Sequence, residues 1–139
     1  MMYMITIPGQ PVGKGRPRFS RWGVYTPDKT AQYEHTVADI WAHAYQGKML
    51  TGTLSVMIVA YYRIPASWPK AKHTDALMGK IRPAVKPDID NICKIVLDAL
   101  NGRAYDDDKS IITLTATKAY SDDPRVVVSL CSDGEVQHV

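Results

Sequence analysis

Two nearby acidic residues and a lysine form the part of the sequence best suited to chemistry. Asp88 and Asp90 lie two residues apart, so an extended or turning backbone sends both carboxylates to one side. Their oxygens are the hard ligands that Mg²⁺ prefers. Lys94 follows Asp90 by one helical turn, which places its ammonium group where it can bind phosphate or stabilise a developing negative charge. This set of residues predicts phosphodiester chemistry.

A run of three aspartates, residues 106–108, supplies a further candidate ligand. Adjacent carboxylates before a strand are costly unless they are solvated, act as caps or bind a cation. A helix ending near Leu100 and a short turn can bring the chain back, so that Asp108 faces Asp88 and Asp90 across a site for one or two metal ions. In the alternative interpretation, Asp88 and Asp90 only cap the helix and complement its dipole.

The acidic residues and the lysine have defined tasks in a nuclease. Carboxylate-bound Mg²⁺ can neutralise the scissile phosphate, activate water and stabilise the leaving 3′ oxygen. Lys94 would help to neutralise the phosphorane. The alternative for Lys94 is a salt bridge on the helix surface with Asp90 or Asp98.

Four basic residues lie close together near the N-terminus, between residues 14 and 21. Lys14, Arg16 and Arg18 alternate with other residues, so an extended backbone sends all three to the same side, where they match a row of phosphates. Glycines and prolines between them exclude a helix or a central strand and predict an extended basic loop. Arg21 and Lys86 complete the set predicted to bind DNA. The alternative is a solvated loop with incidental charge.

Three aromatic residues follow this basic loop. Phe19, Trp22 and Tyr25 can stack on unpaired bases, but roles in the core or in anchoring the loop are favoured. The four histidines have no spacing typical of metal ligands, and His35 and His43 are expected on the surface of a helix.

Hydrophobic periodicity predicts the elements that must position these residues. Four segments have strand patterns and two have helical apolar stripes. The expected strands are Tyr3 to Pro8, Thr53 to Tyr62, Ile111 to Tyr120 and Arg125 to Cys131, and the expected helices are about Thr30 to Tyr45 and Ile89 to Leu100. The segment from Ile64 to Pro87 is expected to be a mobile loop, with a possible short helix after Ser67. The fold class is therefore α+β, with a small mixed β-sheet packed by two main helices.

Length and composition predict one domain, residues 1–139. The chain has 45% hydrophobic residues, a formal charge of +3 and a pI near 8.8, which favours a polyanionic partner only mildly. Cys93 and Cys131 have no metal-binding spacing and are expected to be reduced packing residues in an intracellular protein. No apolar run is long enough to span a membrane, and no signal peptide is recognisable. A cytoplasmic location, in a bacterial or phage-infected cell, is expected.

Several segments together carry a family resemblance. They are Pro8 to Arg18, Tyr25 to Pro27, Lys86 to Asn91 with Lys94, Asp98 to Gly102, and Tyr105 to Ile111. With them the chain resembles the RusA family of Holliday junction resolvases, particularly its phage and prophage branch. The resemblance implies a small α+β homodimer that cuts four-way DNA junctions by paired, Mg²⁺-dependent nicks, leaving 5′-phosphate and 3′-hydroxyl ends.

The resemblance also implies particular roles for the acidic residues. The family's paired metal-binding aspartates fall on Asp88 and Asp90, and its helix lysine falls on Lys94. Its third carboxylate falls on Asp108, with Asp107 as the alternative if the register slips by one residue. Junction resolution in DNA recombination and repair is the expected function. The alternatives are a related nuclease acting on flaps or forks, a non-catalytic DNA-binding protein, and an inactive prophage remnant.

Overall fold

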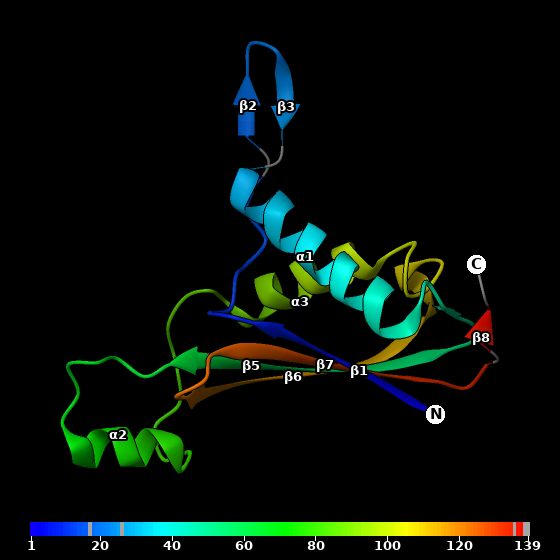
Figure 1. Cartoon of the computed structure of the whole chain (residues 1–139). Coiled ribbons are helices and arrows are strands. Elements are labelled where there is room, and N and C mark those ends of the chain that lie inside the picture. The colour runs from blue at the N-terminus through cyan, green and yellow to red at the C-terminus, as the bar shows by residue number, and fades with distance from the viewer. Residues whose placement is uncertain (17, 26, 135, 138–139) are drawn as a thin grey trace.

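A four-stranded mixed sheet forms the centre of the structure, a computed structural model that describes residues 1–16, 18–25, 27–134 and 136–137 (Figure 1). The side chains of Arg18, Tyr25, Val136 and Gln137 lie outside this description. The strands are β1 (Met2–Pro8), β5 (Leu54–Arg63), β6 (Ile111–Ser121) and β7 (Arg125–Ser132), in the order β1-β7-β5-β6. β5 and β6 are parallel, whereas β7 is antiparallel to both β1 and β5.

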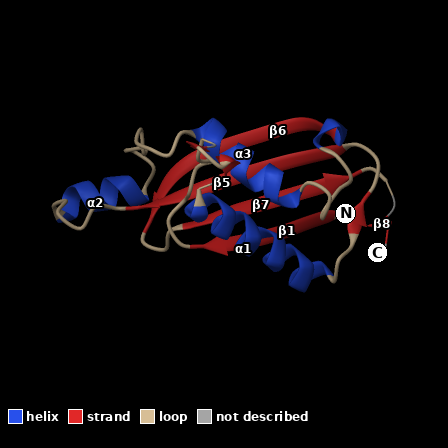
Figure 2. Ribbon diagram, turned by 90° about the horizontal axis from the view of Figure 1, so that it is seen from above, coloured by secondary structure: helices blue, strands red, loops and turns tan. Residues whose placement is uncertain are grey.

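Two helices cover one face of this sheet (Figure 2). They are α1 (Asp28–Tyr45) and α3 (Ile89–Leu100). β1, β5 and β7 alternate between buried and exposed residues, as expected for strands with one buried face. Between sheet and helices lie the largest buried side chains, among them Ile7, Leu54, Ile58, Leu130, Trp41 and Ile95. The predicted fold class, the four strands and the two main helices are confirmed.

Smaller elements lie around this centre. A hairpin of β2 (Arg18–Ser20) and β3 (Gly23–Tyr25) projects beyond α1. Two short strands, β4 (Met49–Leu50) and β8 (Val136–Gln137), pair with each other. The 3₁₀ helix η1 (Asp108–Ser110) precedes β6.

The segment from Ile64 to Pro87 is more structured than the sequence predicts. It contains α2 (Lys70–Leu77), in agreement with the possible short helix. The ring of Trp68 packs edge-on against Tyr120, with 5.4 Å between ring centroids. His73 Nε2 lies 2.7 Å from a carboxylate oxygen of Asp122. These contacts attach the α2 segment to β6 and to the turn that follows it.

The other face of the sheet is covered by neither α1 nor α3 (Figure 2). Met4 and Met57 are each 50% exposed on this face. Cys131 is also exposed, because it occupies an outward position of β7, so its predicted packing role is wrong. Cys93 is buried in α3 as predicted. No helix in the described part of the chain is long and apolar enough to cross a membrane.

Candidate active site

Two of the predicted carboxylates lie at the N-terminus of α3. Asp88 is the N-cap residue, with extended backbone angles, and Asp90 lies in the first turn. Both are exposed. The Asp88 side chain makes no capping hydrogen bond, so it does not satisfy the helix N-terminus in the way that the capping alternative predicts. The Asp90 carboxylate lies where it complements the helix dipole.

The backbone before Asp88 is held by a buried tyrosine. Tyr62, at the end of β5, donates a hydrogen bond from its hydroxyl to Pro87 O at 2.5 Å. Burial raises the pKa of Tyr62 to about 12, and the negative charge of Asp88 contributes to the rise. The phenol therefore stays protonated and keeps its donor role at neutral pH.

Lys94 lies on the exposed face of α3, opposite the buried stripe that includes Ile92 and Val96. Within the described residues its ammonium group forms no ion pair, so the predicted alternative of a salt bridge with Asp90 or Asp98 is not observed. The charge of Lys94 is thus available one helical turn beyond Asp90.

The basic loop runs directly beside α3. Lys14 N donates a hydrogen bond to Asn91 O at 3.0 Å, and Gly15 N donates one to Thr30 Oγ1 at 3.0 Å. A Cβ atom at Gly13 would lie 2.9 Å from Pro87 Cβ, and one at Gly15 would lie 2.6 Å from Thr30 Oγ1. Glycine at both positions lets the loop lie against α3 and against the start of α1.

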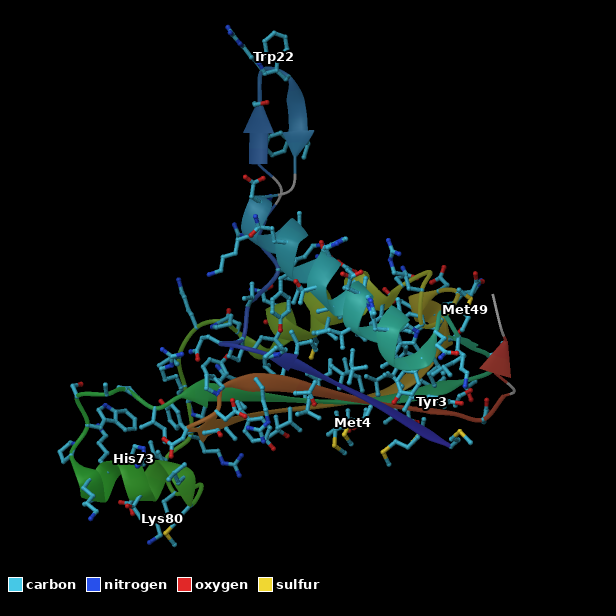
Figure 3. All side chains as sticks on the ribbon, viewed as in Figure 1. Tyr3, Met4, Trp22, Met49, His73 and Lys80 are labelled. Carbon is cyan, nitrogen blue, oxygen red and sulfur yellow. The ribbon has the colours of Figure 1, made fainter. Side chains whose placement is uncertain are left out.

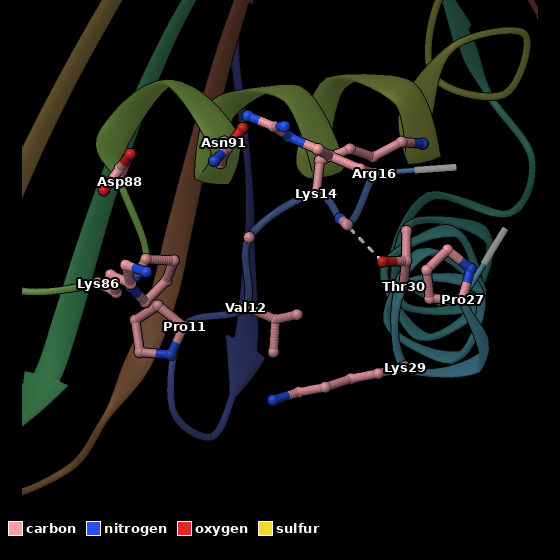
Figure 4. Close-up of a pocket in the computed structure, with 13 residues that line it drawn as sticks. Pro11, Val12, Lys14, Arg16, Pro27, Lys29, Thr30, Lys86, Asp88 and Asn91 are labelled. Atoms are coloured by element: carbon pink, nitrogen blue, oxygen red, sulfur yellow. Dashed lines mark hydrogen bonds between the residues drawn. The ribbon is translucent and has the colours of Figure 1, made fainter. Parts of the chain in front are cut away.

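The loop, α3 and the start of α1 enclose an open cleft of about 890 Å³ (Figure 4). Lining residues come from the basic loop, from the start of α1 and from the segment that leads into α3: Pro11 to Arg16, Pro27, Lys29, Thr30, Lys86 to Asp88, and Asn91. Arg16, Lys29 and Lys86 form no ion pair within the described part of the chain. Asp88 therefore lies at a cleft whose walls carry three cations without an ion pair among the described residues, in addition to Lys14. The sequence did not single out Lys29, because only the fold places the start of α1 beside the basic loop.

Lys14 differs from the other cations of the cleft. Its ammonium group lies 2.9 Å from a carboxylate oxygen of Glu34 and 3.1 Å from one of Asp98. Partial burial alone would lower its pKa, but the hydrogen bonds and charges of these two carboxylates outweigh burial and raise the pKa of Lys14. Lys14 thereby links the basic loop to α1 and α3, an arrangement that the sequence spacing did not predict.

The third predicted carboxylate lies beside the C-terminal half of α3, because Asp108 neighbours Tyr105, whose hydroxyl contacts Leu97 O. Leu97 follows Asp90 by seven residues, which is about 10 Å along a helix axis. The strand register agrees, because Ile111 is opposite Leu54 at the start of β5, whereas Tyr62 contacts Pro87 at its end. Among the described residues, no three acidic, histidine or cysteine side chains lie close enough together to hold a metal ion. The described residues therefore contain no preformed site of three carboxylates within one chain, and Asp108 as the third ligand stays a prediction.

The three adjacent aspartates differ in their surroundings. Asp107 caps η1, since its carboxylate accepts a hydrogen bond from Lys109 N at 3.0 Å. Asp108 Oδ1 is buried and has no hydrogen-bond partner. The neighbouring Tyr105 donates its hydroxyl hydrogen to Leu97 O at 2.7 Å, and its pKa is raised by burial first and by the charge of Asp108 second. Asp107 is thus engaged as a cap, whereas Asp108 Oδ1 has no hydrogen-bond partner among the described residues; which of the two is the third ligand stays a prediction.

The last predicted DNA-binding residues lie on the projecting hairpin. Arg18 begins β2, and its side chain lies outside the described residues. Arg21 is at the hairpin tip beside Trp22. Phe19 is 84% exposed and Trp22 is 85% exposed. The favoured core or anchoring role is therefore wrong for Phe19 and Trp22, because the hairpin points away from the packed layers.

Comparison with known proteins agrees with these features. The model of the endodeoxyribonuclease RusA family matches residues 8–131. An uncharacterised protein of Bacillus subtilis strain 168, YqaN, is 36% identical over 131 residues, which cover 90% of this chain and 92% of that protein. The match spans the basic loop, the cleft and both acidic segments. The chain belongs to the RusA family of endodeoxyribonucleases.

Proposed function

We propose that the protein is a Mg²⁺-dependent, structure-selective endodeoxyribonuclease that resolves four-way DNA junctions by paired symmetric nicks and leaves 5′-phosphate ends. One observation carries the proposal. Asp88 and Asp90 lie exposed at the start of α3, beside a cleft whose walls carry Arg16, Lys29 and Lys86. A nuclease needs this combination, with carboxylates to hold a metal ion and cations to hold the DNA backbone.

The carboxylates at the start of α3 fit a Mg²⁺ ion. Asp88 makes no capping hydrogen bond, and Mg²⁺ is usually held by only one or two carboxylates together with waters and substrate phosphate. When bound, the ion would neutralise the phosphate and lower the pKa of an attacking water. Asp88 and Asp90 are therefore the proposed ligands on this side of the site.

The cationic side chains act on the DNA itself. Arg16 and Lys86 are proposed to bind backbone phosphates along the cleft, and bidentate contacts from an arginine would also fix their orientation. Lys94, free of ion pairs within the described chain and one turn from Asp90, stabilises the negative charge that develops on the scissile phosphate.

The protein is proposed to act as a homodimer. Two-fold symmetry presents two equivalent sites to two equivalent strands of a junction. Among the described residues Asp108 forms no three-ligand cluster with Asp88 and Asp90, and its buried Oδ1 has no hydrogen-bond partner. We infer that Asp108 completes the Asp88 and Asp90 pair of a second copy.

Cutting of a labelled four-way junction tests the nuclease proposal. Wild-type protein should make symmetric nicks with Mg²⁺ and none with EDTA. The Asp90→Asn variant should cut about a hundredfold more slowly or worse and still bind the junction. Asp39→Asn, which alters a 58% exposed aspartate on α1, is the matched control and should cut normally. Binding without cutting by the wild type would instead identify a non-catalytic DNA-binding protein, and a panel of flaps, forks and junctions would define branch selectivity.

Mixing two inactive variants tests the origin of the third ligand. In a heterodimer of Asp90→Asn with Asp108→Asn, a site shared between copies leaves one site intact, so single nicks should appear in the mixture but in neither variant alone. If each site lay within one chain, both sites of the heterodimer would be damaged and no nicking would return.

A further inference from the structure

Hydrogen bonds and a glycine turn define the tip of the β2–β3 hairpin, where Trp22 lies (Figure 3). Ser20 is paired with Gly23, so Arg21 and Trp22 form a two-residue loop. Ser20 Oγ accepts a hydrogen bond from Trp22 N at 3.1 Å and donates one to Gly23 O at 3.2 Å. Gly23 has a backbone φ angle of 120°, which residues other than glycine rarely adopt. The turn thus sets the backbone position from which Trp22 projects.

The hairpin presents apolar surface to solvent. Trp22 is 85% exposed, Phe19 84% and Val24 60%, and Phe19 lies directly opposite Val24. The tip projects away from the sheet and the helices (Figures 1 and 3), so these side chains add nothing to the core. Exposed aromatic side chains held on a defined turn are more typical of a binding surface than of a structural role.

The charges around the tip indicate the class of partner. Residues 18–25 include two arginines and no acidic residue. The Arg21 guanidinium lies 5.1 Å from the centroid of the Trp22 ring, so a cation and an aromatic plane are offered together. In the sequence the hairpin lies between Arg16 and Lys29, and both of these residues line the cleft. An anionic partner with flat apolar groups fits this surface, and nucleic acid with unstacked bases has both properties.

We propose that Trp22, assisted by Phe19 and Arg21, is a stacking wedge that binds unstacked bases at the branch point of a DNA junction. This inference rests on the proposed function, because it requires that the cleft hold branched DNA. Bases within a linear duplex already have neighbours on both faces and offer no free surface to Trp22. Bases at an opened branch point lose one of those neighbours. The wedge therefore contributes to selection of branched over linear DNA.

Binding measured in EDTA tests the wedge without any need for cutting. Fluorescently labelled four-way junction and linear duplex of the same sequence are titrated with the full-length wild type, Trp22→Ala and Trp22→Phe. Loss of stacking on a base should weaken junction binding by about 5- to 150-fold in Trp22→Ala, with duplex binding changed by less than about twofold. Trp22→Phe keeps an aromatic face and should recover most of the affinity. Met78→Ala, which truncates a 65% exposed apolar residue after α2, is the control and should bind normally.

A second measurement places a fluorescent reporter in the DNA. The base analogue 2-aminopurine is placed either at the branch point or within an arm of the junction. Stacking on Trp22 should change its fluorescence at the branch point only, and the change should be absent with Trp22→Ala.

Three results would overturn the proposal: unchanged junction binding by Trp22→Ala, an equal loss on junction and duplex, or a shift from dimer to monomer in sedimentation that assigns the tip to contact between copies. Absence of cutting by the wild type would refute the nuclease function but leave these binding results independent of it.

Discussion

Replacement of Lys14 by methionine separates the two roles considered for this residue, contact with DNA phosphate and bracing of the basic loop. The sequence places Lys14 among the residues that bind DNA phosphates, whereas the structure pairs its ammonium group with Glu34 at 2.9 Å and Asp98 at 3.1 Å. Methionine keeps much of the aliphatic length and removes the charge. If Lys14 braces the basic loop against α1 and α3, its replacement should lower stability more than it changes the electrostatics of DNA binding.

The expected loss of stability follows from the exposure of the three side chains. Lys14 and Glu34 are each 21% exposed and Asp98 is 34% exposed, so the contacts lie between a screened surface pair and a buried one. Exposed pairs contribute about 0.2 to 1 kcal/mol, and hydrogen bonds to charged groups contribute about 1.5 to 3 kcal/mol. Discounted for solvent, Lys14→Met should lower the free energy of unfolding by about 1 to 3 kcal/mol.

Urea denaturation and the salt dependence of junction binding provide the assay. Glu34→Gln should lose part of the same stability, and a double-mutant cycle with Lys14→Met should show coupling of about 0.5 to 1.5 kcal/mol. The slope of log K against log salt should stay unchanged in Lys14→Met but become shallower by about 0.9 in Arg16→Met, which removes one proposed phosphate contact. A shallower slope without loss of stability in Lys14→Met would refute the brace and restore its predicted phosphate contact.

Four further outcomes are expected. The pKa of Lys14 is raised in the folded protein, so its stabilising effect should be complete below pH 10.5 and lost as the pH rises through the raised pKa. Urea denaturation of wild type and Lys14→Met at alkaline pH should therefore give converging free energies of unfolding. Gly13→Ala should cost about 1 to 3 kcal/mol, because its Cβ would lie 2.9 Å from Pro87 Cβ; faster amide exchange at Lys14 N would report a displaced loop, and an unchanged melt would contradict the close approach. The raised pKa of Tyr62 should make the free energy of unfolding fall as the pH rises from 10 towards about 12, because the unfolded chain loses the phenol proton at lower pH than the folded chain. Tyr62→Phe should reduce this fall, and an equal fall in both proteins would contradict the raised pKa. Maleimide should label exposed Cys131 but not buried Cys93 in the folded protein, as mass spectrometry can check, and labelling of Cys93 would show that α3 opens.

The central fold was predictable because each of its elements has a strong local pattern. The alternation in β1 and the apolar stripe of α3 both indicate which residues are buried. The β2–β3 hairpin escaped prediction because each of its strands is only three residues long and follows a segment rich in glycine and proline. The position of α2 depends on contacts of Trp68 and His73 with residues far along the chain, which no local pattern contains.

The local sequence predicts a chemistry for the site, whereas the geometry of the site depends on the fold. The residue types near Asp88 indicate metal and phosphate binding because their spacing is local. The partners of Lys14, by contrast, come from α1 and from the far end of α3. An extended loop shows which side Lys14 faces, but only the packed helices show that two carboxylates are already there.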